Sequence, residues 1–132
     1  MATFHLQIVT PDGGFYDGEA EKLIVRAIGG EVCILPRHAP YVTALGTGVA
    51  RVDIDGKRRH AACAGGMLAV TKNDVRLVAT TFEWAEDIDA ERAQRAKARA
   101  EELIQKAADK REMEQAQARL KRALTRLSVT SK

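Results

Sequence analysis

The sequence predicts an α+β protein in two segregated parts. An N-terminal antiparallel β-sandwich is expected over residues 1–86, and a C-terminal antiparallel two-helix hairpin over residues 87–132. Apolar residues alternate on a period of two in the first part, and Gly-containing turn signals separate these runs. From Asp87 to the end there is no Gly or Pro, and apolar residues recur at spacings of three and four. The change from a period of two to spacings of three and four places the boundary between the two parts after residue 86.

The strand predictions begin with Phe4, Leu6 and Ile8, which share one face of a half-buried strand. A Pro-Asp-Gly-Gly turn at 11–14 interrupts the chain after this strand. Alternation or short apolar runs predict further strands at 20–27, 49–54, 57–64, 67–71 and 75–81. Asp55-Gly56 lies between two of these runs, as is typical of a two-residue hairpin turn. These short strands favour a sandwich or a flattened barrel.

Two apolar stripes predict the helices. The first comprises Ala93, Ala96, Ala100, Leu103 and Ala107, and the second comprises Met113, Ala116, Leu120, Ala123 or Leu124, and Leu127. Asp87 or Asp89 is expected to cap the first helix, and Asp109 followed by Glu112 resembles a capping box near a turn at 108–111. A buried methyl contributes about 0.8 kcal/mol, against about 1.5–3 kcal/mol for Leu or Ile. The Ala-rich hairpin is therefore expected to pack weakly, as an arm that docks or is released.

Composition and charge narrow the range of possible functions. The chain has 132 residues, of which 45% are hydrophobic and 30% charged, as in a globular protein. No apolar run reaches the roughly 18 residues of a membrane helix, and the first residues do not resemble a signal peptide, so a cytoplasmic location is expected unless a partner holds the chain at a membrane. Residues 1–86 carry 9 basic and 10 acidic residues, whereas residues 87–132 carry 12 and 8. The basic arm suits an acidic protein surface, a nucleotide or a nucleic acid.

The two cysteines are too few to staple a secreted fold. Cys33 and Cys63 can be grouped with His38 and His60, but their spacings are not the tight pairs typical of zinc sites. Two reduced thiols, buried or half-buried, and two surface histidines are expected instead.

Several segments together resemble the ε subunit family of bacterial F-type rotary ATP synthase. They are Val9-Thr10-Pro11-Asp12-Gly13 with Phe15-Tyr16 and Gly18-Glu19, the segment 30–40, Gly65-Gly66-Met67, the run Ile88-Asp89-Ala90-Glu91-Arg92-Ala93, and the segment 122–129. The likeness covers nearly the whole chain in order. Cys33 and Arg37 depart from it, because many relatives have Gly there, and neither position is then expected to require a Gly-only backbone.

The resemblance implies a non-catalytic central-stalk subunit, peripheral at the cytoplasmic face of the cell membrane and without membrane insertion. Its β domain would bind the γ subunit and the c-ring, in a complex that couples proton or sodium flow to ATP synthesis. Its mobile arm would reach the catalytic β and α subunits and inhibit ATP hydrolysis. No cofactor is required, and ATP is implied as a regulatory ligand.

The resemblance also implies site residues. Glu31 and His38 match positions near the rotor, and His38 lies between Pro36 and Pro40 in a stiff loop. The expected nucleotide-binding residues are Glu83, Ile88, Asp89, Arg92, Ala93, Arg99, Arg122 and Arg126. Guanidinium groups converging from both helices would suit a triphosphate. Without the resemblance, a solvated loop and a salt-bridged helix pair would be the simpler interpretations.

Two other classes remain to be weighed. A nucleic-acid-binding protein is favoured by the basic hairpin, but acidic residues are interleaved with the basic ones and no aromatic stacking platform is evident. An enzyme is disfavoured because no Gly-rich phosphate loop, nucleophile elbow or paired metal motif occurs.

Overall fold

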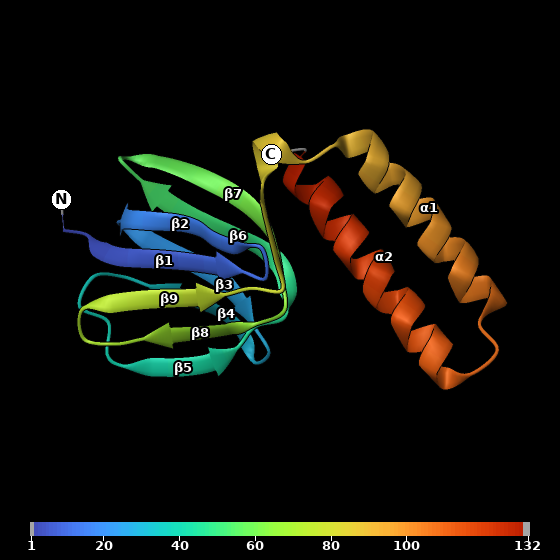
Figure 1. Ribbon diagram of the computed structural model, residues 1–132, viewed down its shortest axis with the longest axis horizontal. Helices are drawn as coiled ribbons and strands as arrows, with labels where there is room; N and C mark the ends of the chain where they lie inside the picture. The colour runs from blue at the N-terminus through green and yellow to red at the C-terminus, as the bar shows by residue number, and fades with distance from the viewer. Residues whose placement is uncertain (1, 131–132) are drawn as a thin grey trace.

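The computed structural model describes residues 2–130, which form a β-sandwich followed by a helical hairpin (Figure 1). The strands are β1 Phe4–Thr10, β2 Gly13–Ala20, β3 Lys22–Ala27, β4 Gly30–Ile34, β5 Tyr41–Ala44, β6 Thr47–Ile54, β7 Lys57–Ala64, β8 Met67–Val70, β9 Asp74–Val78 and β10 Thr81–Trp84. A short 3-10 turn, η1 Ala85–Asp87, leads into the helices α1 Ala90–Lys106 and α2 Lys110–Thr130. The predicted fold class is therefore confirmed.

The strands form two five-stranded sheets with the orders β2-β1-β9-β8-β5 and β10-β7-β6-β3-β4. The neighbouring strands are antiparallel except β1 and β9, which pair in parallel from His5 opposite Asp74 to Val9 opposite Val78. The expectation of a wholly antiparallel sandwich is wrong at this pair. A parallel pair needs a long connection between its strands, and here the chain from β2 to β8 supplies it.

An aliphatic core lies between the sheets. Its largest fully buried side chains in the sandwich are Leu6, Ile8, Leu23, Val25, Ile34, Val52, Leu68 and Leu77. Each such residue contributes about 1.5–3 kcal/mol on burial, so this interface carries most of the stability of the sandwich.

The six strands predicted from the sequence are the six central strands, and the four that were not predicted are the sheet edges β2, β5, β10 and β4. The predicted run at 75–81 spans two strands, because the chain leaves one sheet after Val78 and joins the other at Thr81. Asp55 and Gly56 have φ values of 51° and 75°, so the predicted two-residue hairpin turn is confirmed.

The helix caps agree with the sequence in most respects. The backbone N–H of Arg92 donates to Asp89 Oδ1 over 3.1 Å, so Asp89 rather than Asp87 caps α1. The N–H of Glu112 donates to Asp109 Oδ1 over 2.8 Å, and Glu112 Oε2 accepts from the N–H of Ala108. Glu112 therefore accepts from the N–H of Ala108, the residue before the cap, whereas in the usual capping box it would accept from the N–H of the cap residue, Asp109.

The arm packs through small side chains. Ala93 and Ala100 of α1 and Ala116 and Ala123 of α2 are buried, as their stripes predict, whereas Ala96 is exposed. A second face of α2, with Arg122, Thr125 and Arg126, lies against the outer face of the sandwich at Ala62 and Ala64. Those two alanines are buried although they point away from the aliphatic core, since α2 covers them. No helix among residues 2–130 has the length and apolar character needed to cross a membrane.

The turn between β7 and β8 allows only glycine at position 66. Gly66 has a φ of 109°, and a Cβ added there would lie 1.8 Å from the carbonyl oxygen of Val78. We expect Gly66→Ala to lower the free energy of unfolding by roughly 3 kcal/mol. The turn fixes the backbone of Gly66 and strand β9 fixes the carbonyl oxygen of Val78, so neither can move aside for the added Cβ. Denaturant unfolding measures this change. Gly29→Ala is the matched control: its Cβ would meet nothing within 4 Å, and we expect a change below about 0.5 kcal/mol. Equal losses in the two variants would contradict the packing described.

The two cysteines differ in reactivity. Burial raises the pKa of the Cys63 thiol to about 12, as expected for a buried thiol. Cys33 is exposed on the edge strand β4, so the expectation that it is buried or half-buried is wrong. The thiolate is the form that reacts with alkylating reagents, so at pH 8 iodoacetamide should modify Cys33 and spare Cys63. Mass spectrometry of the native protein checks this, and denaturant should make both thiols reactive. Equal labelling of both cysteines in the native protein would show that Cys63 is accessible.

Candidate functional site

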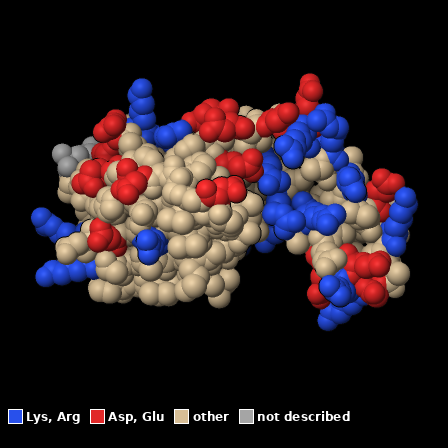
Figure 2. Space-filling model, viewed as in Figure 1, with Lys and Arg blue, Asp and Glu red and all other residues tan. Residues whose placement is uncertain are grey.

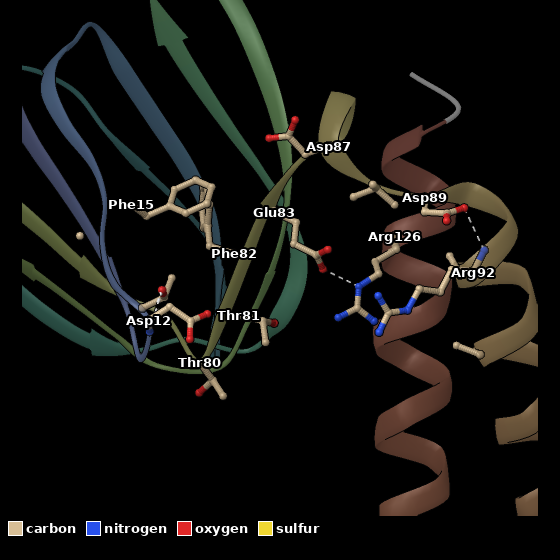
Figure 3. Close-up of a pocket in the computed structure, with 15 residues that line it drawn as sticks. Asp12, Phe15, Thr80, Thr81, Phe82, Glu83, Asp87, Asp89, Arg92 and Arg126 are labelled. Atoms are coloured by element: carbon tan, nitrogen blue, oxygen red, sulfur yellow. Dashed lines mark hydrogen bonds and ion pairs between the residues drawn. The ribbon is translucent and has the colours of Figure 1, made fainter.

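A cavity of about 600 Å³ lies where the sandwich meets the arm (Figure 3). Its walls come from the first hairpin, from the segment that includes β10, and from the arm. The lining residues are Thr10, Asp12, Gly14, Phe15, Thr80, Thr81, Phe82, Glu83, Asp87, Ile88, Asp89, Arg92, Ala93, Ala96 and Arg126. Segments more than 100 residues apart in the sequence thus share one site.

An aromatic cluster fixes the start of the arm beside this cavity. The Trp84 ring packs against Phe15, Tyr16 and Phe82, with ring centroids 5.3–6.3 Å apart. The guanidinium of Arg59 lies 3.8 Å from the centroid of the Trp84 ring and also pairs with Glu86. A backbone N–H bond and this ion pair hold the pKa of Glu86 below its usual value. The chain is therefore held at η1 before Asp89 starts α1.

Two arginines reach into the cavity from facing helices. Arg126 Nε of α2 donates to Glu83 Oε1 over 2.6 Å. Figure 3 shows the side chain of Arg92 extending from α1 toward that of Arg126. Among residues 2–130, no carboxylate lies within ion-pair distance of Arg92. Two converging guanidinium groups, one of them without a carboxylate partner in this part of the chain, suit a phosphate.

Acidic side chains in the cavity offset the positive charge of the two arginines. Asp12, Glu83, Asp87 and Asp89 line it together with the two arginines. Glu83 is already paired with Arg126 and Asp89 is occupied as the α1 cap. The remaining carboxylates and the hydroxyl groups of the Thr80-Thr81 pair can accept hydrogen bonds from a ligand. The cavity thus has one side that can bind an anion, hydrogen-bond acceptors elsewhere, and some apolar lining. This arrangement suits a polar molecule with an anionic end.

The structure brings together six of the eight predicted nucleotide-binding residues. Glu83, Ile88, Asp89, Arg92, Ala93 and Arg126 line the cavity. Arg99 lies farther along α1 and is exposed, and it does not line the cavity. Arg122 lines a smaller groove with Ala62, Ala64 and Thr125, which it shares with Glu83 and Arg126.

Several lining residues had no signal in the sequence. Asp12 and Phe15 belong to the first hairpin, and Thr80 and Thr81 to the crossing between the two sheets. Only the tertiary arrangement places the first hairpin beside α1. Asp87 is one of the two candidates for the helix cap, and its position two residues before Asp89 is the one hint that it faces the same space.

The two predicted rotor residues, Glu31 and His38, do not line this cavity, and they lie at different places in and after β4. Glu31, near the start of β4, forms an ion pair with Arg51, with 2.5 Å between Glu31 Oε2 and Arg51 Nη2. His38 lies in the loop after β4, at the end of the sandwich opposite the arm (Figure 1). Its Nδ1 lies 2.8 Å from the carbonyl oxygen of Ala39, and its ring packs near Tyr41.

Position 37 in the same loop adopts a left-handed backbone. Arg37 has a φ of 67°, a conformation that favours Gly but that other residues occupy at some cost, whereas Cys33 lies in regular strand β4. The sequence-based expectation that neither position needs a Gly-only backbone is compatible with both residues, but it missed that Gly is the preferred residue at position 37.

The chain matches known proteins over almost its full length. The family model of the ATP synthase delta/epsilon chain β-sandwich domain matches residues 3–85, and that of the delta/epsilon chain long α-helix domain matches residues 86–131. The ATP synthase epsilon chain of Caldicellulosiruptor saccharolyticus is 43% identical over 129 residues, covering 98% of this chain and 94% of the relative. That of Bacillus velezensis is also 43% identical, covering 98% of each. That of Ruminococcus albus is 39% identical, covering 100% and 99%.

Solved structures show the same fold. A chain in the Euglena gracilis mitochondrial ATP synthase, described as OSCP/F1/c-ring, has a TM-score of 0.79 at 22% identity and covers 92% of this chain and 77% of that one. A chain in the Tetrahymena thermophila mitochondrial ATP synthase central stalk and c-ring has a TM-score of 0.63 at 11% identity and covers 98% and 97%. At these identities the likeness concerns the fold.

The family models and the near full-length relatives confirm the resemblance seen in the sequence motifs. The chain belongs to the delta/epsilon chain family of ATP synthase, as an epsilon-type, non-catalytic subunit of the central stalk.

Proposed function

We propose that this subunit regulates ATP synthase through an arm whose position depends on ATP. The β-sandwich binds the γ subunit and the c-ring, in a complex that couples proton or sodium flow to ATP synthesis at the cytoplasmic face of the cell membrane. The arm, when released, reaches the catalytic β and α subunits and inhibits ATP hydrolysis. Family membership supports the stalk part of this proposal, as does the Tetrahymena thermophila chain of the same fold, which comes from a central stalk with its c-ring.

One observation carries the regulatory part: the cavity is built jointly by the sandwich, α1 and α2. Arg92 and Arg126 face it from the two helices, and Glu83 faces it from β10. A nucleotide held there contacts all three parts only while the arm is docked. A ligand at one hundred times its dissociation constant that binds only this state stabilises it by about 2.7 kcal/mol.

The packing of the arm is weak enough for such an amount to matter. The buried residues of the two helices are Ala93, Ala100, Ala116, Ala123 and Val129, four of which contribute only a methyl group. Among residues 2–130, the one ion pair between a helix of the arm and the sandwich joins Arg126 to Glu83. The free energy difference between the docked and the released arm is therefore small enough for ligand binding to outweigh it.

The released arm presents basic side chains. Arg119 and Lys121 of α2 are exposed even in the docked arm and do not line the cavity. Figure 2 shows Lys and Arg side chains gathered on the arm and where it meets the sandwich. Opposite charge on a catalytic subunit would steer and hold such a surface. ATP acts in this scheme as a regulatory ligand, and the subunit needs no cofactor.

ATP binding is tested with the full chain by calorimetric titration. We expect Arg92→Ala and Arg126→Ala each to weaken ATP binding about tenfold or more, because each removes a charged hydrogen-bond donor to phosphate. Arg111→Ala, with the same change of charge at the far end of the hairpin, should leave binding unchanged. No binding by the unsubstituted chain at millimolar ATP, or an equal loss in the Arg111 variant, would overturn the nucleotide site.

Inhibition is tested in the reconstituted catalytic complex with γ and this subunit. We expect Arg119→Glu combined with Lys121→Glu to raise the concentration for half-inhibition of ATP hydrolysis roughly 2- to 10-fold, because the arm loses electrostatic attraction. The inhibition that remains should depend less on salt. Lys57→Glu combined with Lys72→Glu makes the same charge change on the sandwich and should not alter inhibition. Unchanged inhibition in the arm variant, with normal assembly of the complex, would refute this use of the basic surface.

A further inference from the structure

His5 links three strands of one sheet through its side chain. It lies on β1 and points out of the sandwich between the neighbouring strands β2 and β9. Its Nε2 is 2.5 Å from Asp17 Oδ1 of β2, and its Nδ1 is 2.8 Å from Asp74 Oδ1 of β9. Both ring nitrogens therefore have a carboxylate oxygen within hydrogen-bond distance, from opposite sides.

This geometry favours the protonated ring. An ionised carboxylate only accepts hydrogen bonds, and neutral imidazole carries a single N–H. Neutral His5 can therefore satisfy one of its two neighbours and must turn a nitrogen lone pair toward the other. Only the imidazolium, which has two N–H donors, makes both bonds at once.

The surrounding charges favour the imidazolium. From β2, Asp17 faces His5, and Glu19 is its register partner and accepts a bond from the Thr3 hydroxyl. From β9, Asp74 faces it, while Arg76, the nearby cation on that strand, is bonded to Gln7. Within residues 2–130, three carboxylates and one engaged guanidinium thus lie on the strands beside the ring. The bonds to Asp17 and then Asp74 raise the pKa of His5 above 6.5.

The bonded strands include the one parallel pair of the described sheets. β1 lies between β2 and β9, and Asp74 is the first residue of β9, at the end of the turn from β8. That turn lines a surface groove of about 160 Å³ together with Leu35 and His38 of the loop after β4. A change at His5 is thus connected through Asp74 to the end of the sandwich that lies away from the arm.

We propose that His5 is a proton-dependent clasp, which holds β2, β1 and β9 together as an imidazolium and loosens them when it loses its proton. The clasp is engaged at pH values below the folded-state pKa of His5, which lies above 6.5. Because the folded pKa is the higher one, its stabilising effect is complete below the unfolded value of 6.5 and is lost as the pH rises through the folded value.

The first test is an NMR titration of the histidine rings in the full chain, with the His5 signal identified by its absence in His5→Gln. We expect a midpoint above 6.5 that falls in Asp17→Asn and in Asp74→Asn, because each variant removes an anionic acceptor. Thr3→Ala is the control, since it removes a neighbouring bond without changing charge. A midpoint at or below 6.5, or one that both Asp variants leave unchanged, would overturn the clasp.

The second test separates a clasp from a surface ion pair without consequence. Amide hydrogen exchange, corrected for the intrinsic effect of pH, should show protection in β1 and β9 falling several-fold between about pH 6 and about pH 9. At both pH values, His5→Gln should show about the protection that the unsubstituted chain shows at about pH 9, and therefore no such fall. If His5→Gln keeps the same pH dependence as the unsubstituted chain, another group is responsible and the proposal fails.

Discussion

The burial of Trp84 fixes the junction at which the sandwich ends and the arm begins. Its ring is 6% exposed, packs against three other aromatic rings, and is covered by the Arg59 guanidinium. Because Arg59 also pairs with Glu86, the chain is held one turn beyond the last strand. An arm that is released, as proposed above, would change position only beyond this point. In the docked form, Asp87 and Asp89 line the cavity.

Two kinds of packing coexist in the chain. Branched aliphatic side chains fill the sandwich, so its sheets are difficult to separate. The arm approaches the sandwich through Ala62 and Ala64 and closes on itself mainly through alanines. Such contacts allow close approach with little apolar area, and the Glu83–Arg126 pair supplies direction rather than much energy. An arm that docks and is released, as proposed above, needs this division.

The sequence predicted the central strands and not the sheet edges, for a physical reason. Central strands such as β1 and β6 bury alternate residues against the core, which leaves a clear period of two. β2, an edge strand, contains three glycines and has one buried residue, so its alternation is blurred. In the candidate site, the family resemblance identified residues of β10 and of both helices, such as Glu83, Arg92 and Arg126. The contribution of Asp12 depends on a long-range approach that no local pattern encodes.

The parallel pairing of β1 with β9 also affects how the chain is made. The first strand lies inside its sheet, and one of its two neighbours is separated from it by 69 residues, as between His5 and Asp74. During synthesis from the N-terminus, β1 and β2 can form a hairpin early, but the sheet stays open along the other side of β1 until residue 78 has left the ribosome. Since pairings this distant in sequence form slowly, one side of β1 stays unpaired while the segment from β3 to β9 is being made, and this interval is when the nascent chain most needs protection from aggregation.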